Sequence, residues 1–425
     1  MRTFRYVAAC ISVALTALTP AAAHAQDLVV NRNVTVREEP DRDTPVIDYA
    51  VPGDTFDVLD AGQRQNGYYH VRLPDAREGW VYQTFVRRLN PDALVAAVRP
   101  DEMVVHFIDV DQGNAALLEF PCAAVLIDLG GRGDDAAMHL LAYLRKFFER
   151  RTDLNRRFAA VYVTHTHVDH NSNLKRSIDG RYLVGSYIHN GRLNGSGRPD
   201  AVWMASYLTA QSPDIVGLAI SESEVEAAGP GGLTNAAIDP VQCAGVDPQF
   251  RVLAGGRATN PGWSNDDFKN GNNHSVVIRV DFGEASFLFP GDLENAGIAD
   301  LLTRYAGTGL LDVDVLEVSH HGAENGTTPA LLSALSPEIA IISMGPERIQ
   351  QQWTAYDYGH PRQLTVQALD QAVSGSRPRR TVRVASGQET FVDFDLDRAI
   401  YATGWDGDIV LTANRSGALS VRTTH

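Results

Sequence analysis

The chain has 425 residues and a mass of 46.3 kDa, which is enough for one large and one small domain, or for two or three of ordinary size. Apolar residues make up 44% and charged residues 21%, a balance that excludes an intrinsically disordered chain, a collagen-like repeat and a coiled coil. The net charge of −15 disfavours a general nucleic-acid-binding surface, because an acidic chain repels a phosphate backbone at long range.

The N-terminus has the order of a secretory signal peptide. Two arginines precede the apolar stretch Tyr6–Leu18, and the small-residue site Ala23-His24-Ala25 follows Pro20. This pattern predicts a signal peptide over residues 1–25 and a secreted or periplasmic mature protein with no integral membrane span and a charge of −17. The alternative is an uncleaved anchor, which the shortness of the apolar stretch disfavours, since a spanning helix needs about 20 residues.

Cleavage would remove Cys10 and leave two cysteines, Cys122 and Cys243. An oxidising compartment allows a disulfide between them, and a pair of buried thiols is the equal alternative.

Residues 26–89 alternate short apolar runs with turn residues such as Pro52-Gly53-Asp54, which predicts a small all-β barrel. The segments Val34–Pro40 and Glu78–Val81 also resemble those of the bacterial Src-homology-3-like domain. This resemblance implies a cell-wall peptide or glycan as a partner, and the alternative is a structural domain without a ligand. Residues 90–102, framed by two prolines, are predicted to be a linker.

Residues 103–425 are predicted to form one large domain in which strands and helices alternate. Apolar runs indicate strands, and 3.6-residue spacing indicates helices between them. Strands are expected at 103–110, 115–120, 123–129, 158–163, 275–282, 285–289, 313–318 and 339–343, with more after Thr381, and helices at 136–148, 294–305, 329–335 and 364–373. This order predicts an α+β fold, an αββα sandwich of two sheets between outer helices. The segment between Asn171 and Gly271 is interpreted as a long loop region that sets specificity.

Histidines gather directly after the strand at 158–163. His165, His167 and His170 fall within six residues, with Asp169 among them, and imidazole and carboxylate groups are the usual ligands of zinc and similar ions. The spacing allows His165 and His167 to share one ion while Asp169 and His170 reach a second. Asp292 and the pair His320-His321 follow other strand ends, and we expect them at the same edge of the sandwich.

The segment His165–His170 resembles the H-x-H-x-D-H motif of the metallo-β-lactamase superfamily at every defining position. The resemblance implies that His165, His167, Asp169, His170, Asp292 and His321 bind two divalent metal ions, zinc or alternatively manganese. Asp292 would bridge the ions, and Asp128 would orient a ligand from behind. His321 is preferred over His320 as the last ligand because it precedes glycine, and the reverse assignment stays open.

A narrower resemblance is to the nuclease-like domain of ComEC-like competence proteins. The segments Phe107–Ala115, Asn272–Val277, His320-His321-Gly322 and Tyr358–Pro361 carry it. Asp111 and Asn114 depart from the glycine and aspartate of the first motif, which leaves the role of that loop open, and His167 stands where those relatives often carry aspartate.

The remaining candidates receive simpler interpretations. His274 is either a third metal histidine or part of a structural turn. His106 is expected in the core or behind the ligands, His139 on a helix surface, and His189 in a glycine-rich loop near the cleft. Arg377, Arg379 and Arg380 are read as a solvated charged face, with phosphate binding as the alternative.

Together these features predict an exported binuclear hydrolase in which a metal-bound hydroxide attacks a small phosphodiester or related ester. His320 or His360 would supply the proton to the leaving group. One alternative is a β-lactamase or lactonase acting on carboxylic derivatives, and another is a cell-wall-associated binding protein. Extended nucleic acid is disfavoured as a substrate by the negative charge.

Overall fold

The computed structural model describes residues 26–60, 63–89, 98–211 and 214–424. The predicted signal peptide and most of the predicted linker lie outside these described residues. None of the described helices combines the length and apolarity needed to cross a bilayer.

The N-terminal part is a small β domain. Its strands are β1 Gln26–Val30, β2 Val34–Arg37, β3 Val46–Ala50, β4 Thr55–Val58, β5 Arg64–Gln65, β6 Tyr68–Arg72, β7 Glu78–Tyr82 and β8 Val86–Arg88. They pair in the order β3-β2-β7-β6-β4-β1-β8, with β5 added on β6. Alternate residues such as Val34 and Val36 point into its own apolar core, as the period of two requires.

The large domain contains two sheets that face each other. The first runs in the order β14 Val216–Ala219, β13 Leu183–His189, β12 Arg157–Val163, β11 Ala124–Ile127, β10 Ala116–Glu119, β9 Glu102–Phe107, β23 Ile409–Asn414, β24 Leu419–Thr423. The second runs in the order β15 Gln249–Ala254, β16 Val277–Phe282, β17 Ala285–Phe289, β18 Val315–Glu317, β19 Ile339–Ile342, β22 Ile400–Ala402. A separate hairpin joins β20 Ser376–Gly387 to β21 Thr390–Arg398.

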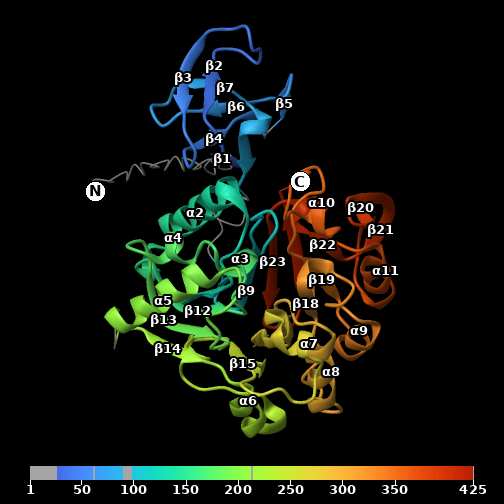
Figure 1. Cartoon of the computed structure of the whole chain (residues 1–425). Coiled ribbons are helices and arrows are strands. Elements are labelled where there is room, and N and C mark those ends of the chain that lie inside the picture. Colours follow the sequence, from blue (N-terminus) through green and yellow to red (C-terminus); the bar gives the residue numbers. More distant parts are fainter. Residues whose placement is uncertain (1–25, 61–62, 90–97, 212–213, 425) are drawn as a thin grey trace, which may run out of the picture.

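Helices cover the outer face of each sheet (Figure 1). On the first sheet lie α2 Gly133–Arg150, α4 Leu174–Ile178 and α5 Arg198–Gln211; on the second lie α8 Asn295–Arg304, α9 Pro329–Leu335 and α11 Gln363–Ala372. Shorter helices in the connections are α3 Val168–Asn171, α6 Glu222–Ala228, α7 Asn265–Lys269, α10 Ala355–Tyr358 and α12 Thr403–Asp406. The predicted αββα sandwich is therefore confirmed.

Neighbouring residues of one strand pack into two different apolar cores, one between the sheets and one between a sheet and its outer helices. Leu117 of β10 packs against α2 on the outer face, whereas Leu118 belongs to the core between the sheets. Phe107 of the first sheet stacks on Phe289 of the second, with ring centroids 6.2 Å apart. This two-sided burial explains why the strands are nearly continuous apolar runs.

The interpretation of residues 171–271 as a long loop is wrong. The segment contains β13, α5, β14, α6 and β15, which extend both sheets and the outer helical layer. Glycine and serine within Leu183–His189 weaken the strand pattern, but parallel pairing with β12 completes the strand.

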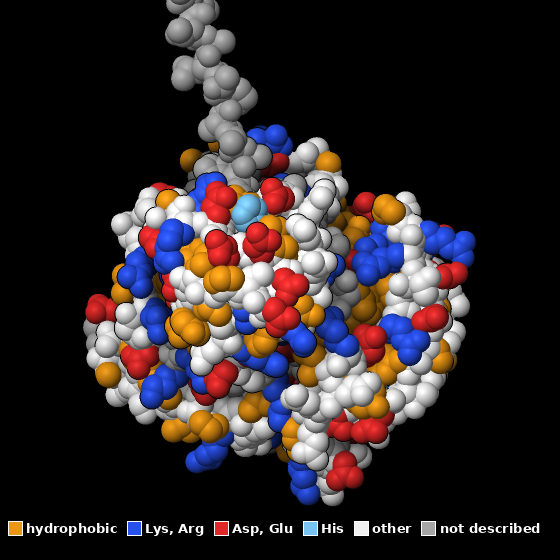
Figure 2. All heavy atoms as spheres, turned by 90° about the horizontal axis from the view of Figure 1, so that it is seen from above, with side chains coloured by type: hydrophobic (Ala, Val, Ile, Leu, Met, Phe, Trp, Pro, Cys, Tyr) orange, Lys and Arg blue, Asp and Glu red, His pale blue; other side chains and the backbone are white. Residues whose placement is uncertain are grey.

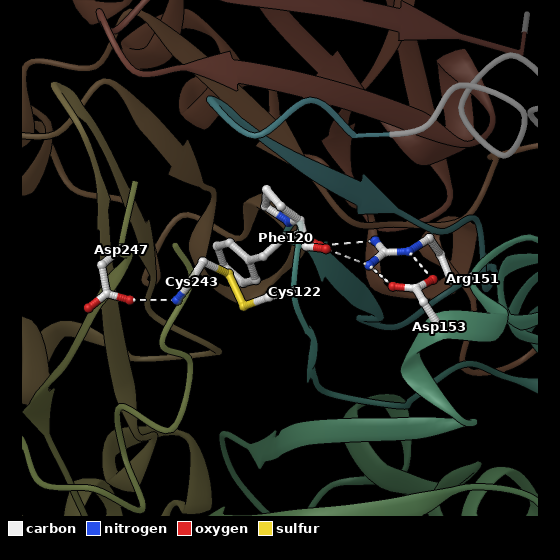
Figure 3. The surroundings of a disulfide bond; sticks show 7 residues. Phe120, Cys122, Arg151, Asp153, Cys243 and Asp247 are labelled. Carbon is white, nitrogen blue, oxygen red and sulfur yellow. Dashed lines mark hydrogen bonds and ion pairs between the residues drawn. A yellow bond between two sulfur atoms is a disulfide. The ribbon is translucent and has the colours of Figure 1, made fainter. Parts of the chain in front are cut away.

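Cys122 and Cys243 form a disulfide, with Cα atoms 5.5 Å apart (Figure 3). Cys122 follows β10 of the first sheet, and Cys243 lies in the segment that leads into β15 of the second. The bond therefore links the two sheets across a separation of 121 residues. On the same side, Arg151 binds the carbonyl oxygens of Phe120 and Pro121 and so fixes the turn that carries Cys122.

Candidate metal centre

The histidine-rich segment begins where β12 ends. Parallel pairing of β11 with β12 places Asp128, just past β11, beside Thr164. Asp128 accepts hydrogen bonds from the backbone N–H of Thr164 and from its hydroxyl, both at 2.8 Å. These bonds fix the start of the loop that carries His165 and His167 into α3.

Four side chains converge at the edge of the sandwich. Ligand atoms of Asp169, His170, Asp292 and His321 all lie within 4.8 Å of one another. His170 Nε2 is 3.0 Å from Asp292 Oδ1, and His321 Nε2 is 3.4 Å from Asp169 Oδ2 and 3.5 Å from Asp292 Oδ2. They come from three strand ends, those of β12, β17 and β18, which topology brings to one point.

The donor atoms fit a divalent cation. His170 Nε2, Asp292 Oδ1 and His321 Nε2 are buried, and none of them has a hydrogen-bond partner of acceptable geometry. Three orphaned donors and acceptors facing one point would be costly in a protein that bound nothing there. Neutral imidazole and carboxylate are also the ligand types that zinc takes.

Both cluster histidines are oriented from behind. His170 Nδ1 lies 2.7 Å from Asp128 Oδ2, and His321 Nδ1 donates to the carbonyl oxygen of Ser343 at 2.6 Å. Each of these bonds turns the Nε2 atom toward the cluster, as ligand histidines require. The neighbouring His320 instead uses Nδ1 with Asn325 Oδ1 at 3.1 Å, and its Nε2 is 4.0 Å from Asp292 Oδ2. Of the pair, the structure thus brings His321 into the cluster and leaves His320 at its margin.

His165 and His167 form a second group beside the cluster. His165 Nε2 lies 3.0 Å from His167 Nδ1 and 3.9 Å from Asp292 Oδ2. Burial lowers the pKa of both imidazoles, and neighbouring histidines lower the pKa of His165 further. Both rings are therefore neutral at pH 7, as metal ligands must be.

His274 is not available to this second group. Its Nε2 donates to the carbonyl oxygen of Phe268 at 2.8 Å, and its Nδ1 accepts from the backbone N–H of Arg257 at 3.1 Å. Both ring nitrogens are therefore engaged in hydrogen bonds. Of the two interpretations of His274, the structure supports the structural turn and not the metal ligand. Burial lowers the pKa of His274 to about 4.

The charged groups of the cluster shift one another's pKa values and so favour one another's charged forms. Burial alone would lower the pKa of His170, but Asp292 and Asp128 raise it well above the usual range. Burial likewise disfavours the charged form of Asp292, yet His170 and His321 bring the pKa of this carboxyl well below its ordinary value. These imidazoles and carboxylates lie close enough to attract one another, and a bound cation would replace the protons on the imidazoles.

His360 lies next to the cluster. Its ring centroid is 5.7 Å from that of His320 and 6.1 Å from that of His321, and its Nδ1 is 3.4 Å from Gln112 Nε2. Burial, with the two neighbouring histidines, lowers its pKa well below the ordinary value. Both residues predicted to handle protons, His320 and His360, therefore lie beside the cluster.

Sequence reasoning missed several polar groups around the centre. Asn272 Nδ2 donates to Glu294 Oε1 at 2.8 Å, and its buried Oδ1 has no partner. Glu317 lies beneath His321, accepts from the Ser343 hydroxyl at 2.8 Å, and has its pKa raised by burial to about 7. Asn272 lies within the recognised N-N-x-S motif, so its position gave a usable signal, whereas nothing local marks Glu317.

The departure at Asp111 has a structural explanation. Asp111 adopts φ +57°, a left-handed conformation that favours glycine. Its carboxylate binds Arg87 of β8 through both oxygens, at 2.6 and 2.7 Å. At the position where the related motif has glycine, this chain therefore has an aspartate that forms an ion pair with the β domain. The ion pair anchors the loop in which Gln112 contacts His360.

Three predictions about other histidines need correction or refinement. His139 is not a surface residue, because it lies on the buried face of α2 and its Nε2 contacts Asp408 at 2.9 Å. His106 is in the core, bonded to Tyr143 and Glu119 and apart from the cluster. His189 ends strand β13, where its ring stacks on Tyr187, and does not lie in a loop.

The arginines near the C-terminus are wrongly interpreted as a solvated face. Arg377 and Arg380 both bind the fully buried carboxylate of Asp406, at 2.7 and 2.6 Å, and Arg379 alone pairs at the surface, with Asp395. A buried carboxylate needs a positively charged partner, and Arg377 and Arg380 supply it to Asp406.

Comparisons with known proteins agree with this architecture. The metallo-beta-lactamase superfamily model matches residues 108–345, and the bacterial SH3 domain model matches residues 32–87. Recombination protein 2 of Haemophilus influenzae is 39% identical over 89 residues, which are 21% of this chain and 10% of that protein. ComE operon protein 3 of Bacillus subtilis is 32% identical over 123 residues, 29% of this chain and 13% of that protein. The chain thus spans only a small part of these relatives.

Among solved structures, the metallo-beta-lactamase fold protein YhfI from Bacillus subtilis covers 75% of this chain and 99% of its own, at 12% identity and a TM-score of 0.36. The resemblances expected from the histidine motif, from the competence-protein segments and from the β domain are confirmed by the family models and the relatives.

Proposed function

The chain belongs to the metallo-β-lactamase superfamily, a family of metal-dependent hydrolases, and from that premise we propose that it is an exported binuclear hydrolase of small phosphodiesters. The observation that carries this proposal is the convergence of Asp169, His170, Asp292 and His321, three of them buried, with His165 and its neighbour His167 beside them. Asp169, His170, Asp292 and His321 would hold one ion, and His165 and His167 would share the second with Asp292. When bound, such ions supply Lewis-acid polarisation of an ester and activate water at neutral pH.

Two features favour a phosphodiester over a carboxylic substrate. His274 does not add a third histidine to His165 and His167, since both of its ring nitrogens are engaged elsewhere. Relatives named for recombination and competence are each 39% identical to a part of this chain, although they share only 10% of their own length with it.

The histidines beside the cluster divide the proton handling. The His320 side chain is 21% exposed and reaches solvent, so it can take up a proton and pass it to the leaving oxygen. His360 is buried and neutral, because burial lowers its pKa, and it offers a hydrogen bond that orients the substrate. Gln112, held by the loop anchored at Asp111, fixes the ring of His360 from the opposite nitrogen.

Export and the small size of the substrate rest on separate features. The Cys122–Cys243 disulfide suits an oxidising compartment such as the periplasm or the exterior. Figure 2, which views the molecule from above, shows acidic and basic side chains interspersed over that face. A mixed surface on an acidic chain disfavours a long polyanion and tolerates a small one.

The β domain offers a place for a cell-wall peptide or glycan. A groove of about 710 Å³ is lined by Tyr68, Tyr82 and Phe85 and by the polar segment Pro40–Asp43. Aromatic side chains beside polar ones suit both peptide and sugar ligands. Co-sedimentation with purified peptidoglycan tests this partner; equal sedimentation of wild type and Tyr82→Ala would argue against the groove.

The decisive experiment combines metal analysis with three substrates. We expect purified protein to carry zinc or manganese and to hydrolyse bis(p-nitrophenyl) phosphate faster than nitrocefin, with a short single-stranded oligonucleotide as the third substrate. His167→Ala should lose at least about 100-fold in rate, since it removes a ligand. His70→Ala, on the β domain, is the matched control and should retain full activity. Hydrolysis of nitrocefin alone would refute the phosphodiester assignment, and metal-free protein that cleaves nothing would refute the enzyme.

A further inference from the structure

A cavity of about 1080 Å³ adjoins the segment that carries the cluster ligands. Val168 and Ser172, on either side of Asp169 and His170, form part of its wall. The rest comes from the start of α2, from the loop 348–352 with Thr354, and from Arg32 of the β domain. Its size lies just above the usual range of small-molecule sites, roughly 300–1,000 Å³. Neither the metal ligands nor the proposed proton carriers line this cavity, so the proposed chemistry does not account for it.

The charges that line the cavity leave two cations uncompensated. Each of its three aspartates has an arginine partner: Asp111 with Arg87, Asp134 with Arg176 and Asp135 with Arg32, at 2.6, 2.9 and 3.2 Å. Arg132 and Arg348 line the same cavity, and neither pairs with a carboxylate within the described ranges. On a chain of net charge −15, such a local excess of positive charge favours an anion.

A row of rings runs from His360, beside the cluster, to Trp353, which contacts Arg132 in the cavity wall. The ring of His360 stacks on Tyr358 at 5.5 Å, and Tyr358 lies 6.3 Å from Trp353. The guanidinium of Arg132 lies over the Trp353 ring, 5.4 Å from its centroid.

Trp353 is held in a conformation that tryptophan seldom adopts. Its φ is +65°, in the left-handed region, and its backbone N–H donates to Asp357 Oδ2 at 2.7 Å. Despite its size, the side chain is 49% exposed. Backbone strain of this kind concentrates at ligand sites, because the local fold must stabilise it. The result is a half-exposed indole with the Arg132 guanidinium against it.

We propose that Trp353, Arg132 and Arg348 form a second subsite, which binds an aromatic ring and a further anionic group on the same substrate as the scissile phosphodiester. The ring stacks on Trp353, and the anion enters the cavity between the two guanidinium groups. This inference rests on the proposed phosphodiesterase function and narrows its substrate class to aromatic phosphodiesters that carry an additional phosphate or carboxylate. Two localised cations suit such a compact dianion while the acidic surroundings still repel a long polyanion.

A pair of dinucleotides tests the subsite. Thymidylyl-thymidine without and with a 5′-phosphate differs only in the second anion, and bis(p-nitrophenyl) phosphate reports on the metal centre. We expect the wild type to show a KM about tenfold lower for the phosphorylated dinucleotide, the effect of one charge-assisted contact. Arg348→Gln should reduce this preference to about one, and Trp353→Leu should raise KM for both dinucleotides by about tenfold, as the loss of a stacking contact does. Arg379→Gln, a surface arginine on β20, is the matched control and should keep the wild-type preference.

The outcomes separate the two proposals. If the wild type hydrolyses bis(p-nitrophenyl) phosphate but does not distinguish the dinucleotides, the subsite is refuted and the phosphodiesterase stands. The same holds if Arg348→Gln retains the preference. If the wild type hydrolyses none of the three compounds when loaded with metal, the proposed function itself fails.

Discussion

Replacing Arg87 by methionine should weaken the junction between the two domains. The Arg87 side chain is 17% exposed, and it binds both carboxylate oxygens of Asp111 and the carbonyl oxygen of Asp109. Its removal would leave the carboxylates of Asp111 and Asp109, 11% and 12% exposed, without their cation. Breaking a buried pair by removing one partner costs about 3–5 kcal/mol, and we expect about 3 kcal/mol here because some solvent reaches the site.

A second substitution tests the reasoning. Asp111→Gly in the Arg87→Met background removes the orphaned carboxylate and places glycine at φ +57°, where it saves about 1 kcal/mol of backbone strain. The double variant should therefore recover about 2 kcal/mol of the loss, because two adverse terms disappear together. Arg42→Met, at an exposed position of the β domain, is the control and should change stability by less than about 0.5 kcal/mol.

Urea denaturation followed by circular dichroism measures these free energies, and hydrogen exchange at β8 and residues 108–114 locates the loosened contact. A loss below about 1 kcal/mol in Arg87→Met would refute the argument, since a solvated pair costs no more than that. Failure of Asp111→Gly to restore stability would refute the role assigned to the left-handed backbone.

Three further predictions follow from the disulfide, the cluster and a buried histidine. Cys122→Ser with Cys243→Ser should lower the free energy of unfolding by about 4–5 kcal/mol, because the bond closes a loop of about 120 residues; an equal stability of oxidised and reduced wild type in urea would contradict this. Asp292→Asn should lose bound metal by mass spectrometry and about 100-fold or more in hydrolysis, and full metal content in this variant would argue against Asp292 as the shared ligand. Burial lowers the pKa of His274 to about 4, so the unfolded chain binds a proton between pH 6.5 and 4 that the folded chain excludes, and stability is lost as the pH falls through this window. The difference in unfolding free energy between wild type and His274→Gln should therefore change between pH 6.5 and 4 and stay constant above pH 7; a difference independent of pH would contradict the assignment.

The sequence anticipated the layered fold and the convergence of the site because both depend on short-range patterns. Continuous apolar runs predict buried strands, and functional loops follow strand ends, so His165, His167, Asp169 and His170 could be placed together from spacing alone. His139 was misjudged although the signal was present. It shares a helix face with Ala136 and Tyr143, both buried, and helical spacing applied strictly would have placed it inside.

Outside residues 171–271, the element types, the ligand chemistry and the separate β domain could be predicted from the amino-acid sequence, because they follow from local periodicity and residue type. Which partner each polar group meets depends on the tertiary fold. The Ser343 carbonyl turns His321 toward the cluster, Arg87 of the β domain meets Asp111, and Cys122 meets Cys243. These pairs join residues far apart in the chain, and no local pattern encodes which distant strand ends the topology brings into contact.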